Sequence, residues 1–98
     1  MLLEATIFKV LSDPTRLRLL ALLAMRGETC VCMLAQALKL PEFKVSKHLA
    51  IMRMAGMVRS RREGTWIYYR LARPRNRLEE RVQECLRACL REHRTVRA

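Results

Sequence analysis

Acidic and aromatic residues are both scarce in this sequence. Nine Asp and Glu residues stand against 20 Lys and Arg residues in a chain of 98, which gives a formal net charge of +11. This balance favours nucleic acid as the partner, because each phosphate that a protein neutralises releases condensed counterions. The alternatives are binding to a membrane surface, and a basic surface that serves only solubility. Aromatic residues make up only 5% of the chain, too few for the stacking platforms of a single-strand binder.

Long apolar runs are also missing. The most apolar stretch, residues 17–25, is shorter than the roughly 18 residues that a membrane-spanning helix needs. The N-terminus lacks the basic segment, apolar core and cleavage site of a secretory signal. We therefore expect a cytoplasmic protein without a membrane partner. Its four cysteines would be reduced there, and serve metal binding, redox chemistry or packing.

No assembled set of catalytic residues is visible. The sequence has no paired carboxylates placed for acid–base chemistry, no nucleophile elbow, no glycine-rich phosphate loop and no Cys-x-x-Cys motif of a thiol oxidoreductase. Apolar residues make up 51% of the chain, as in a globular fold, and the length predicts a single domain over residues 1–98. We expect a protein that is not an enzyme and has no permanent cofactor.

Glycine and proline, with three residues each, divide the chain into elements. Apolar periodicity predicts helices over residues 2–11, 14–26, 28–40, 42–55 and 75–94. Asp13 can cap the second helix, Pro14 suits its first position, and Gly27 ends it. Strand-favouring residues around a Glu63-Gly64 turn predict a β-hairpin over residues 57–73. The expected fold class is mostly α with one β-hairpin.

Two short helices that break at Pro41, followed at once by a hairpin, indicate a winged helix-turn-helix, with the helix-turn-helix over about residues 29–55. In such a module the second helix enters the major groove. With the apolar stripe of this helix against the core, its other faces meet DNA, and the predicted contacts are Lys44, Ser46, Lys47 and His48. His48 lies near the edge of the stripe, where a packing or hydrogen-bonding role is favoured over contact with a base.

The hairpin adds basic residues near its tip. We predict that Arg61 and Arg62 contact phosphates or the minor groove, and the alternative is an edge strand whose charges guard against aggregation. Trp66, Tyr68 and Tyr69 are expected to pack in the hairpin and core.

Four segments resemble the ArsR/SmtB family of metal-responsive repressors, and most closely its arsenic-responsive members. They are Ser12-Asp13-Pro14-Thr15-Arg16-Leu17-Arg18, Glu28-Thr29-Cys30-Val31-Cys32, Val45-Ser46-Lys47-His48-Leu49 and Arg62-Glu63-Gly64-Thr65-Trp66-Ile67-Tyr68-Tyr69. The resemblance covers about residues 5–73. It implies a homodimer built by the first and last helices, which binds double-stranded operator DNA and loses affinity when an inducer binds. It also implies that Cys30 and Cys32 contribute to the inducer site.

The two cysteine pairs differ in spacing. Cys30 and Cys32 would point about 200° apart on a regular helix, so they share one ion only where the helix has not begun or its first turn unwinds. A helix N-terminus also favours the thiolate that binds metal. Cys85 and Cys89 lie on one helical face, either as ligands or as small packing residues. Position 35, where arsenic-sensing members often have a third cysteine, is Ala35.

The number of thiolates decides which ion is expected. Cys85 or Cys89 could complete a three-thiolate site with Cys30 and Cys32, which fits the trivalent ions As(III) and Sb(III). All four thiolates would suit Cd(II), Pb(II) or Zn(II). We expect As(III) or Sb(III) to be the inducer, with the divalent ions as the alternative. A disulfide-based redox switch is a further alternative.

Overall fold

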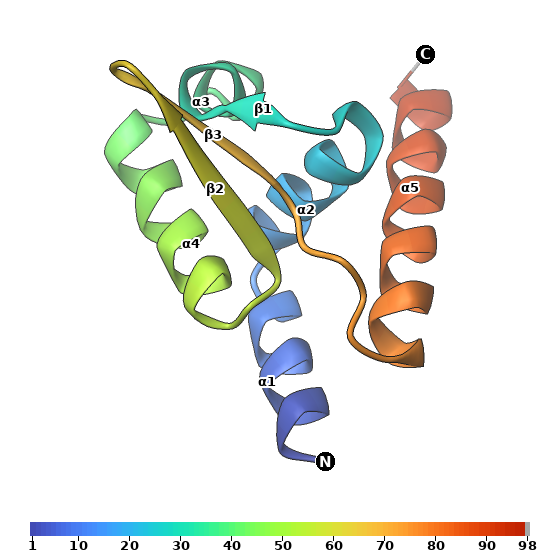
Figure 1. Cartoon of the computed structure of the whole chain (residues 1–98). Helices are drawn as coiled ribbons and strands as arrows, with labels where there is room; N and C mark the ends of the chain where they lie inside the picture. Colours follow the sequence, from blue (N-terminus) through green and yellow to red (C-terminus); the bar gives the residue numbers. More distant parts are fainter. Residues whose placement is uncertain (98) are drawn as a thin grey trace.

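The computed structural model describes the backbone of residues 1–97 and the side chains of residues 1–93, so the end of the predicted domain at residue 98 lies outside the described part. The elements are α1 (Leu2–Leu11), α2 (Pro14–Arg26), β1 (Thr29–Cys30), α3 (Val31–Leu38), α4 (Glu42–Met54), β2 (Val58–Glu63), β3 (Trp66–Leu71) and α5 (Arg77–Arg97). Figure 1 shows α5 along one side of the molecule and the hairpin with α4 on the other. The prediction of a mostly helical fold with one hairpin is confirmed.

The second helix begins and ends where its sequence signals predict. The backbone N–H of Arg16 donates to Asp13 Oδ2 at 3.0 Å, and Pro14 occupies the first position of α2. At the other end Gly27 adopts a φ of +76°, a left-handed conformation that glycine enters at no steric cost. Between these ends α2 packs against α5, and Leu19, Leu20 and Leu23 of α2 are buried in the core.

The predicted helix over residues 28–40 is wrong at its start. Thr29 and Cys30 form the short strand β1, whose partners in β3 are Tyr69 and Tyr68 respectively. The helix α3 therefore begins only at Val31. Local periodicity could not show this strand, because its hydrogen-bonding partner lies far along the chain and a strand of this length has no pattern of its own.

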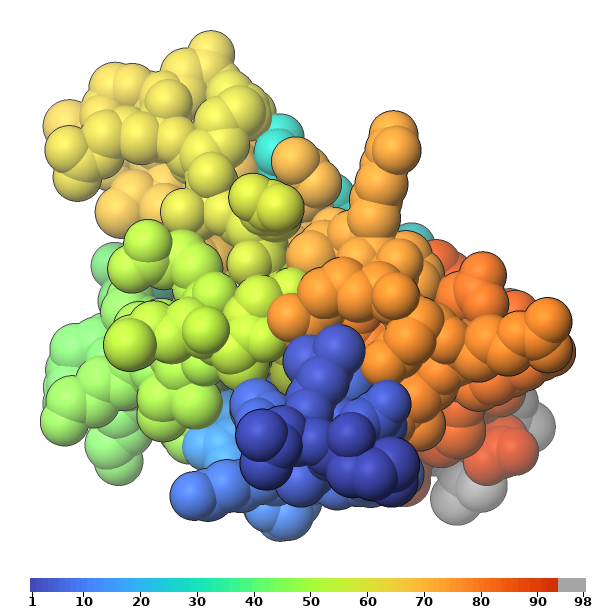
Figure 2. Space-filling model, turned by 60° about the horizontal axis from the view of Figure 1, so that its bottom comes forward, coloured from blue at the N-terminus to red at the C-terminus, as the bar shows by residue number. Residues whose placement is uncertain are grey.

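The hairpin completes a three-stranded antiparallel sheet in the order β1-β3-β2. Glu63 pairs with Trp66, so the tight turn is Gly64-Thr65 and not the predicted Glu63-Gly64. Gly64 has a φ of +62°, which suits the first position of a two-residue hairpin turn. Figure 2 shows the hairpin, in yellow, projecting from the body of the molecule as a wing.

The core lies where the helices meet the base of the sheet. Its fully buried side chains come from α1, α2, α3, α4 and β2: Ile7, Leu19, Leu20, Leu23, Leu34, Val45, Leu49, Met52 and Val58. Three of them, Val45, Leu49 and Met52, form the apolar stripe of α4 that was predicted to face the core. None of the described helices is long and apolar enough to span a bilayer.

Candidate thiol site and nucleic-acid interface

The cysteine pair lies at the junction of β1 and α3. Cys30 is extended, with φ −75° and ψ 154°, and caps α3 by accepting the backbone N–H of Met33 on its Sγ at 3.4 Å. A disulfide joins Cys30 to Cys32, and their Cα atoms are 5.4 Å apart. Because Cys30 precedes the helix, both sulfurs reach the same side of the chain, which is the geometry that sharing one ion requires. Their role as ligands remains a prediction.

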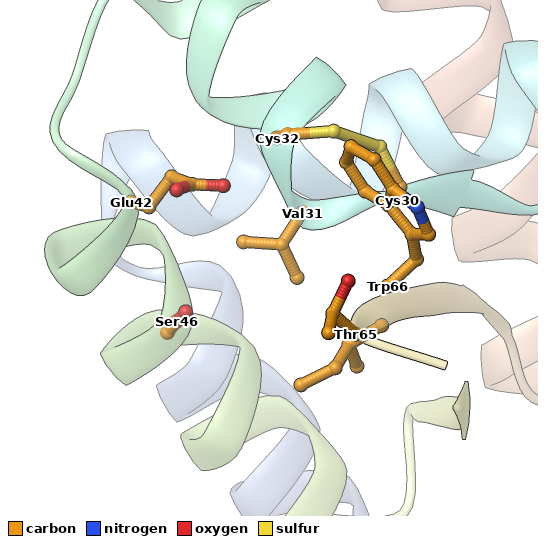
Figure 3. A pocket seen from close by; sticks show the side chains of 8 residues that line it. Cys30, Val31, Cys32, Glu42, Ser46, Thr65 and Trp66 are labelled. Atoms are coloured by element: carbon orange, nitrogen blue, oxygen red, sulfur yellow. A yellow bond between two sulfur atoms is a disulfide. The ribbon is translucent and has the colours of Figure 1, made fainter. Parts of the chain in front are cut away.

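A hollow of about 280 Å³ opens beside this pair, and three parts of the fold line it. The start of α3, the start of α4 and the tip of the wing contribute Cys30, Val31, Cys32, Glu42, Ser46, Thr65, Trp66 and Ile67. Figure 3 shows the indole of Trp66 on the same side of the hollow as Cys30, and the carboxylate of Glu42 on the side of α4. Any ligand held by the sulfurs here faces both elements that are predicted to contact DNA.

Trp66 differs from its expected place. The sequence predicted packing in the hairpin or core, but the side chain is 53% exposed at the wing tip. Tyr69 is buried as expected, because it faces the core from the central strand. Alternation along β3 places these two residues on opposite faces, but the sequence alone did not show which of the two faces meets the core.

Arg61 connects the wing to the segment that precedes Cys30. Its Nη2 donates to Glu28 Oε1 at 2.7 Å, its Nη1 donates to Glu63 Oε2 at 2.8 Å, and its guanidinium carbon lies 4.7 Å from the centre of the Tyr68 ring. The hydrogen bond from Arg61 lowers the pKa of Glu28, and the same two carboxylates raise the pKa of Arg61. The predicted contact of Arg61 with DNA stays a prediction, but in this structure its charge is shared with two carboxylates.

The predicted recognition helix presents basic residues to solvent. Lys44, Ser46 and Lys47 are exposed on α4, as is Arg62 on the wing. His48 is instead half-buried, and its Nδ1 lies 4.0 Å from Asp13 Oδ2, too far for a hydrogen bond. In the described part of the chain His48 Nδ1 has no hydrogen-bond partner, so of the two favoured roles the half-buried ring suits packing. The DNA contacts of all these residues stay predictions.

The second cysteine pair lies on α5. The Sγ atoms of Cys85 and Cys89 are 3.9 Å apart, and the contact with Cys85 raises the pKa of the Cys89 thiol. Within the described part of the chain, no three His, Cys, Asp or Glu side chains gather in a group that could hold a metal ion. One copy of the chain thus presents the thiols as two separate pairs, and does not assemble the predicted three- or four-thiolate set by itself.

Comparison with known proteins places this geometry in a family. A family model described as bacterial regulatory protein, arsR family, matches residues 13–60, from the cap of α2 into β2. The arsenic resistance transcriptional regulator ArsR1 of Pseudomonas putida is 52% identical over 65 residues, which cover 66% of this chain and 51% of that protein. The match therefore spans about half the length of that relative.

Two solved structures are similar over most of both chains. The antimony-specific transcriptional repressor AntR is 36% identical with a TM-score of 0.74, and the match covers 93% of this chain and 78% of that one. The homodimeric winged helix-turn-helix DNA-binding domain Mb0332 of Mycobacterium bovis, described as a possible ArsR-family regulator, is 33% identical with a TM-score of 0.72 and covers 93% and 81%. With its winged helix-turn-helix fold, this chain belongs to the arsR family of bacterial regulatory proteins.

Proposed function

We propose that this chain is a cytoplasmic transcriptional repressor that binds operator DNA as a homodimer and leaves it when cysteine thiolates capture As(III) or Sb(III). The position of the thiol pair carries the proposal. Cys30 ends β1, which pairs with the wing strand β3, and it also caps α3, which packs against α4. A ligand on the two sulfurs therefore acts on both elements that would contact DNA.

The DNA interface is supported by charge and shape. The net charge of +11 suits a polyanion, and exposed Lys44 and Lys47 lie on the helix that a winged helix-turn-helix places in the major groove. Arg62 on the wing would meet the adjacent backbone. In a symmetric dimer the two recognition helices reach half-sites about one helical turn apart, which predicts a palindromic operator.

The choice of ion rests on the chemistry of sulfur and on the relatives. Soft thiolates select soft ions, and the similar proteins include an arsenic resistance regulator and an antimony-specific repressor. We infer that Cys85 or Cys89 of a second copy supplies the third thiolate, beside those of Cys30 and Cys32. Binding requires both cysteines of the first pair as thiols, as the reducing cytosol would keep them. Typical coupling energies of 1–3 kcal/mol would weaken operator binding by about 5- to 150-fold.

The Cys30–Cys32 disulfide supports a second candidate function, a thiol redox switch. Two sulfurs that form a bond at the β1–α3 junction would alter the same elements that an ion alters. Oxidation, rather than metal capture, would then release the operator.

A single experiment separates these candidates. The reduced full-length protein is titrated onto a fluorescent duplex from the upstream region of its own gene, and release is followed by anisotropy at fixed salt. We expect arsenite and antimonite to release the duplex. Release by Cd(II), Pb(II) or Zn(II) alone would favour the divalent alternative, and release by peroxide alone would favour the redox switch. If the Cys85→Ser/Cys89→Ser variant responds to arsenite like the native chain, the second pair packs α5 and is not a ligand.

A further inference from the structure

The outward face of α4 carries apolar side chains where a helix that only meets water carries polar ones. At about 3.6 residues per turn, the positions directly opposite the buried stripe of this helix are Phe43, Lys47, Ala50 and Met54. The side chain of Phe43 is 63% exposed, and that of Met54 is 87% exposed. The midline of the outward face is therefore apolar except for Lys47.

Basic residues surround the aromatic end of this midline. Lys44 follows Phe43 in the chain, Lys47 lies one turn further along α4, and both lysines are exposed. Such cations can contact phosphates beside a groove, so a duplex that docks on this face would enclose the ring of Phe43. Phe43 also lies in the first turn of α4, and the N-terminal residues of a recognition helix are those that meet base edges.

In the major groove the four bases offer one apolar group, the C5-methyl group of thymine. We propose that Phe43 selects thymine in each half-site of the operator, by packing its ring against this methyl group. The inference rests on the proposed function, since it takes double-stranded DNA as the partner of α4. It adds the kind of base that the helix selects and the residue that selects it.

The composition of α4 favours recognition of the methyl group over recognition of adenine by paired hydrogen bonds. Adenine is read in that way by Asn or Gln, and residues 42–54, all of which the structure describes, include neither. The one arginine of the helix, Arg53, lies in its last turn, at the end opposite to Phe43. Ser46 and Lys47 are left to contact other base edges or phosphates. An A·T pair at Phe43 is therefore distinguished by its methyl group.

The test removes the methyl group and leaves every hydrogen-bonding group of the bases in place. Deoxyuridine differs from thymidine only by lacking the C5-methyl group. In the upstream duplex used for the arsenite titration, deoxyuridine replaces thymidine first at all positions, and then at one symmetric pair of positions at a time. Anisotropy at fixed salt gives the affinity of the reduced full-length chain for each duplex. Phe43→Ala is measured on the same duplexes, and circular dichroism checks that it is folded.

We expect uracil at one symmetric pair of positions to weaken binding of the native chain by about fourfold per half-site, the scale of one buried methyl group. Phe43→Ala should bind the thymine operator more weakly, and its affinity should not change when the methyl groups are removed. An effect of uracil on duplex shape acts on both chains alike, so it cancels in this comparison. The matched control is Met33→Ala, which deletes an exposed apolar side chain from α3 and should keep the full sensitivity to uracil.

Native affinity that stays the same with uracil at every position would overturn the inference, and so would a Phe43→Ala variant as sensitive to uracil as the native chain. A variant that becomes monomeric in sedimentation velocity, with equal losses on thymine and uracil duplexes, would overturn it too and assign Phe43 to a contact with a second copy.

Failure of this inference is distinguishable from failure of the proposed function. Arsenite that releases a duplex bound without sensitivity to methyl groups refutes the selection of thymine alone. Methyl-sensitive binding that no thiophilic ion releases refutes the inducer mechanism and leaves the role of Phe43 in place.

Discussion

The helices α2 and α3 are each capped at the N-terminus by a side chain that accepts a backbone N–H. Asp13 Oδ2 accepts the N–H of Arg16 at 3.0 Å, and Cys30 Sγ accepts the N–H of Met33 at 3.4 Å. A carboxylate is a strong, charged acceptor, whereas sulfur is a weak one. The cap of α3 is therefore the one that a ligand can displace at small cost, and the cap of α2 holds the scaffold.

Cys30→Ser should separate DNA binding from release. Serine is a favoured helix cap, so α3 should start at the same place and operator affinity should stay close to that of the native chain. The variant lacks one of the two adjacent sulfurs, so we expect arsenite to release no duplex in the anisotropy assay. A full response to arsenite in this variant would refute the thiol site at the β1–α3 junction.

Asp13→Ala should lower the free energy of unfolding by about 1 kcal/mol near neutral pH, because the N–H of Arg16 loses its acceptor. That N–H lowers the pKa of Asp13 from its ordinary value of 3.8. The stabilisation is thus fully present above pH 3.8 and is lost as the pH falls through the lowered pKa, so native and variant chains should converge in acid. Urea denaturation across this range measures the effect, and Asp13→Asn, which keeps a capping oxygen, should lose less.

At the scale of elements, the strand β1 joins the thiol pair to the wing. Its two residues pair with β3, and just before them Glu28 receives two hydrogen bonds from Arg61 Nε and Nη2 across the sheet. In the proposed mechanism a movement of Cys30 would therefore reach the wing as well as α3. The ion pair is exposed, so its contribution to coupling is modest.

Glu28→Gln should weaken the response to arsenite and not the binding of DNA. An exposed ion pair contributes little, so the ratio of operator affinities without and with arsenite should fall by no more than a few-fold. Glu63→Gln is the matched control, because Glu63 pairs with Arg61 from the same strand and does not touch the segment before β1. A fall of the same size in both variants would mean that the charge of Arg61, rather than this link, matters.

Lys47→Ala should reduce operator affinity through the recognition helix α4. If Lys47 neutralises a phosphate or reaches a guanine, its loss should weaken binding, and a phosphate contact should reduce the slope of log affinity against log salt by about one. Arg18→Ala removes an exposed cation from α2 and tests whether net charge alone explains the effect. Unchanged affinity of Lys47→Ala at fixed salt would count against α4 as the reading element.

At the scale of the whole molecule, apolar surface on α1 lacks cover within one chain. Leu2 and Phe8 are 88% and 58% exposed, while Ile7 and Val10 of the same helix are buried. Figure 2 shows α1, in blue, on the outside of the molecule between α4 and the start of α5. An apolar helix face of this kind supports the proposed dimer, in which α1 and α5 of two copies meet.

Phe8→Glu should therefore disrupt the dimer without unfolding the chain, since the side chain is largely exposed in one copy. Sedimentation velocity is expected to show a dimer for the native protein and a monomer for the variant, with circular dichroism unchanged. Operator affinity should fall steeply because each monomer reaches only one half-site. A variant that remains dimeric would exclude α1 from the interface.

The sequence by itself determined the helices, the caps of α2, the hairpin and the family, because these depend on local periodicity, capping residues and short motifs. Only the tertiary structure decided that Cys30 lies in a strand, that Arg61 is held by Glu28, and that Trp66 and the cysteine pair line the same hollow. Each of these depends on pairing between segments more than 30 residues apart. Such contacts are fixed by the register of the sheet, which leaves no signal in the residues on either side considered alone.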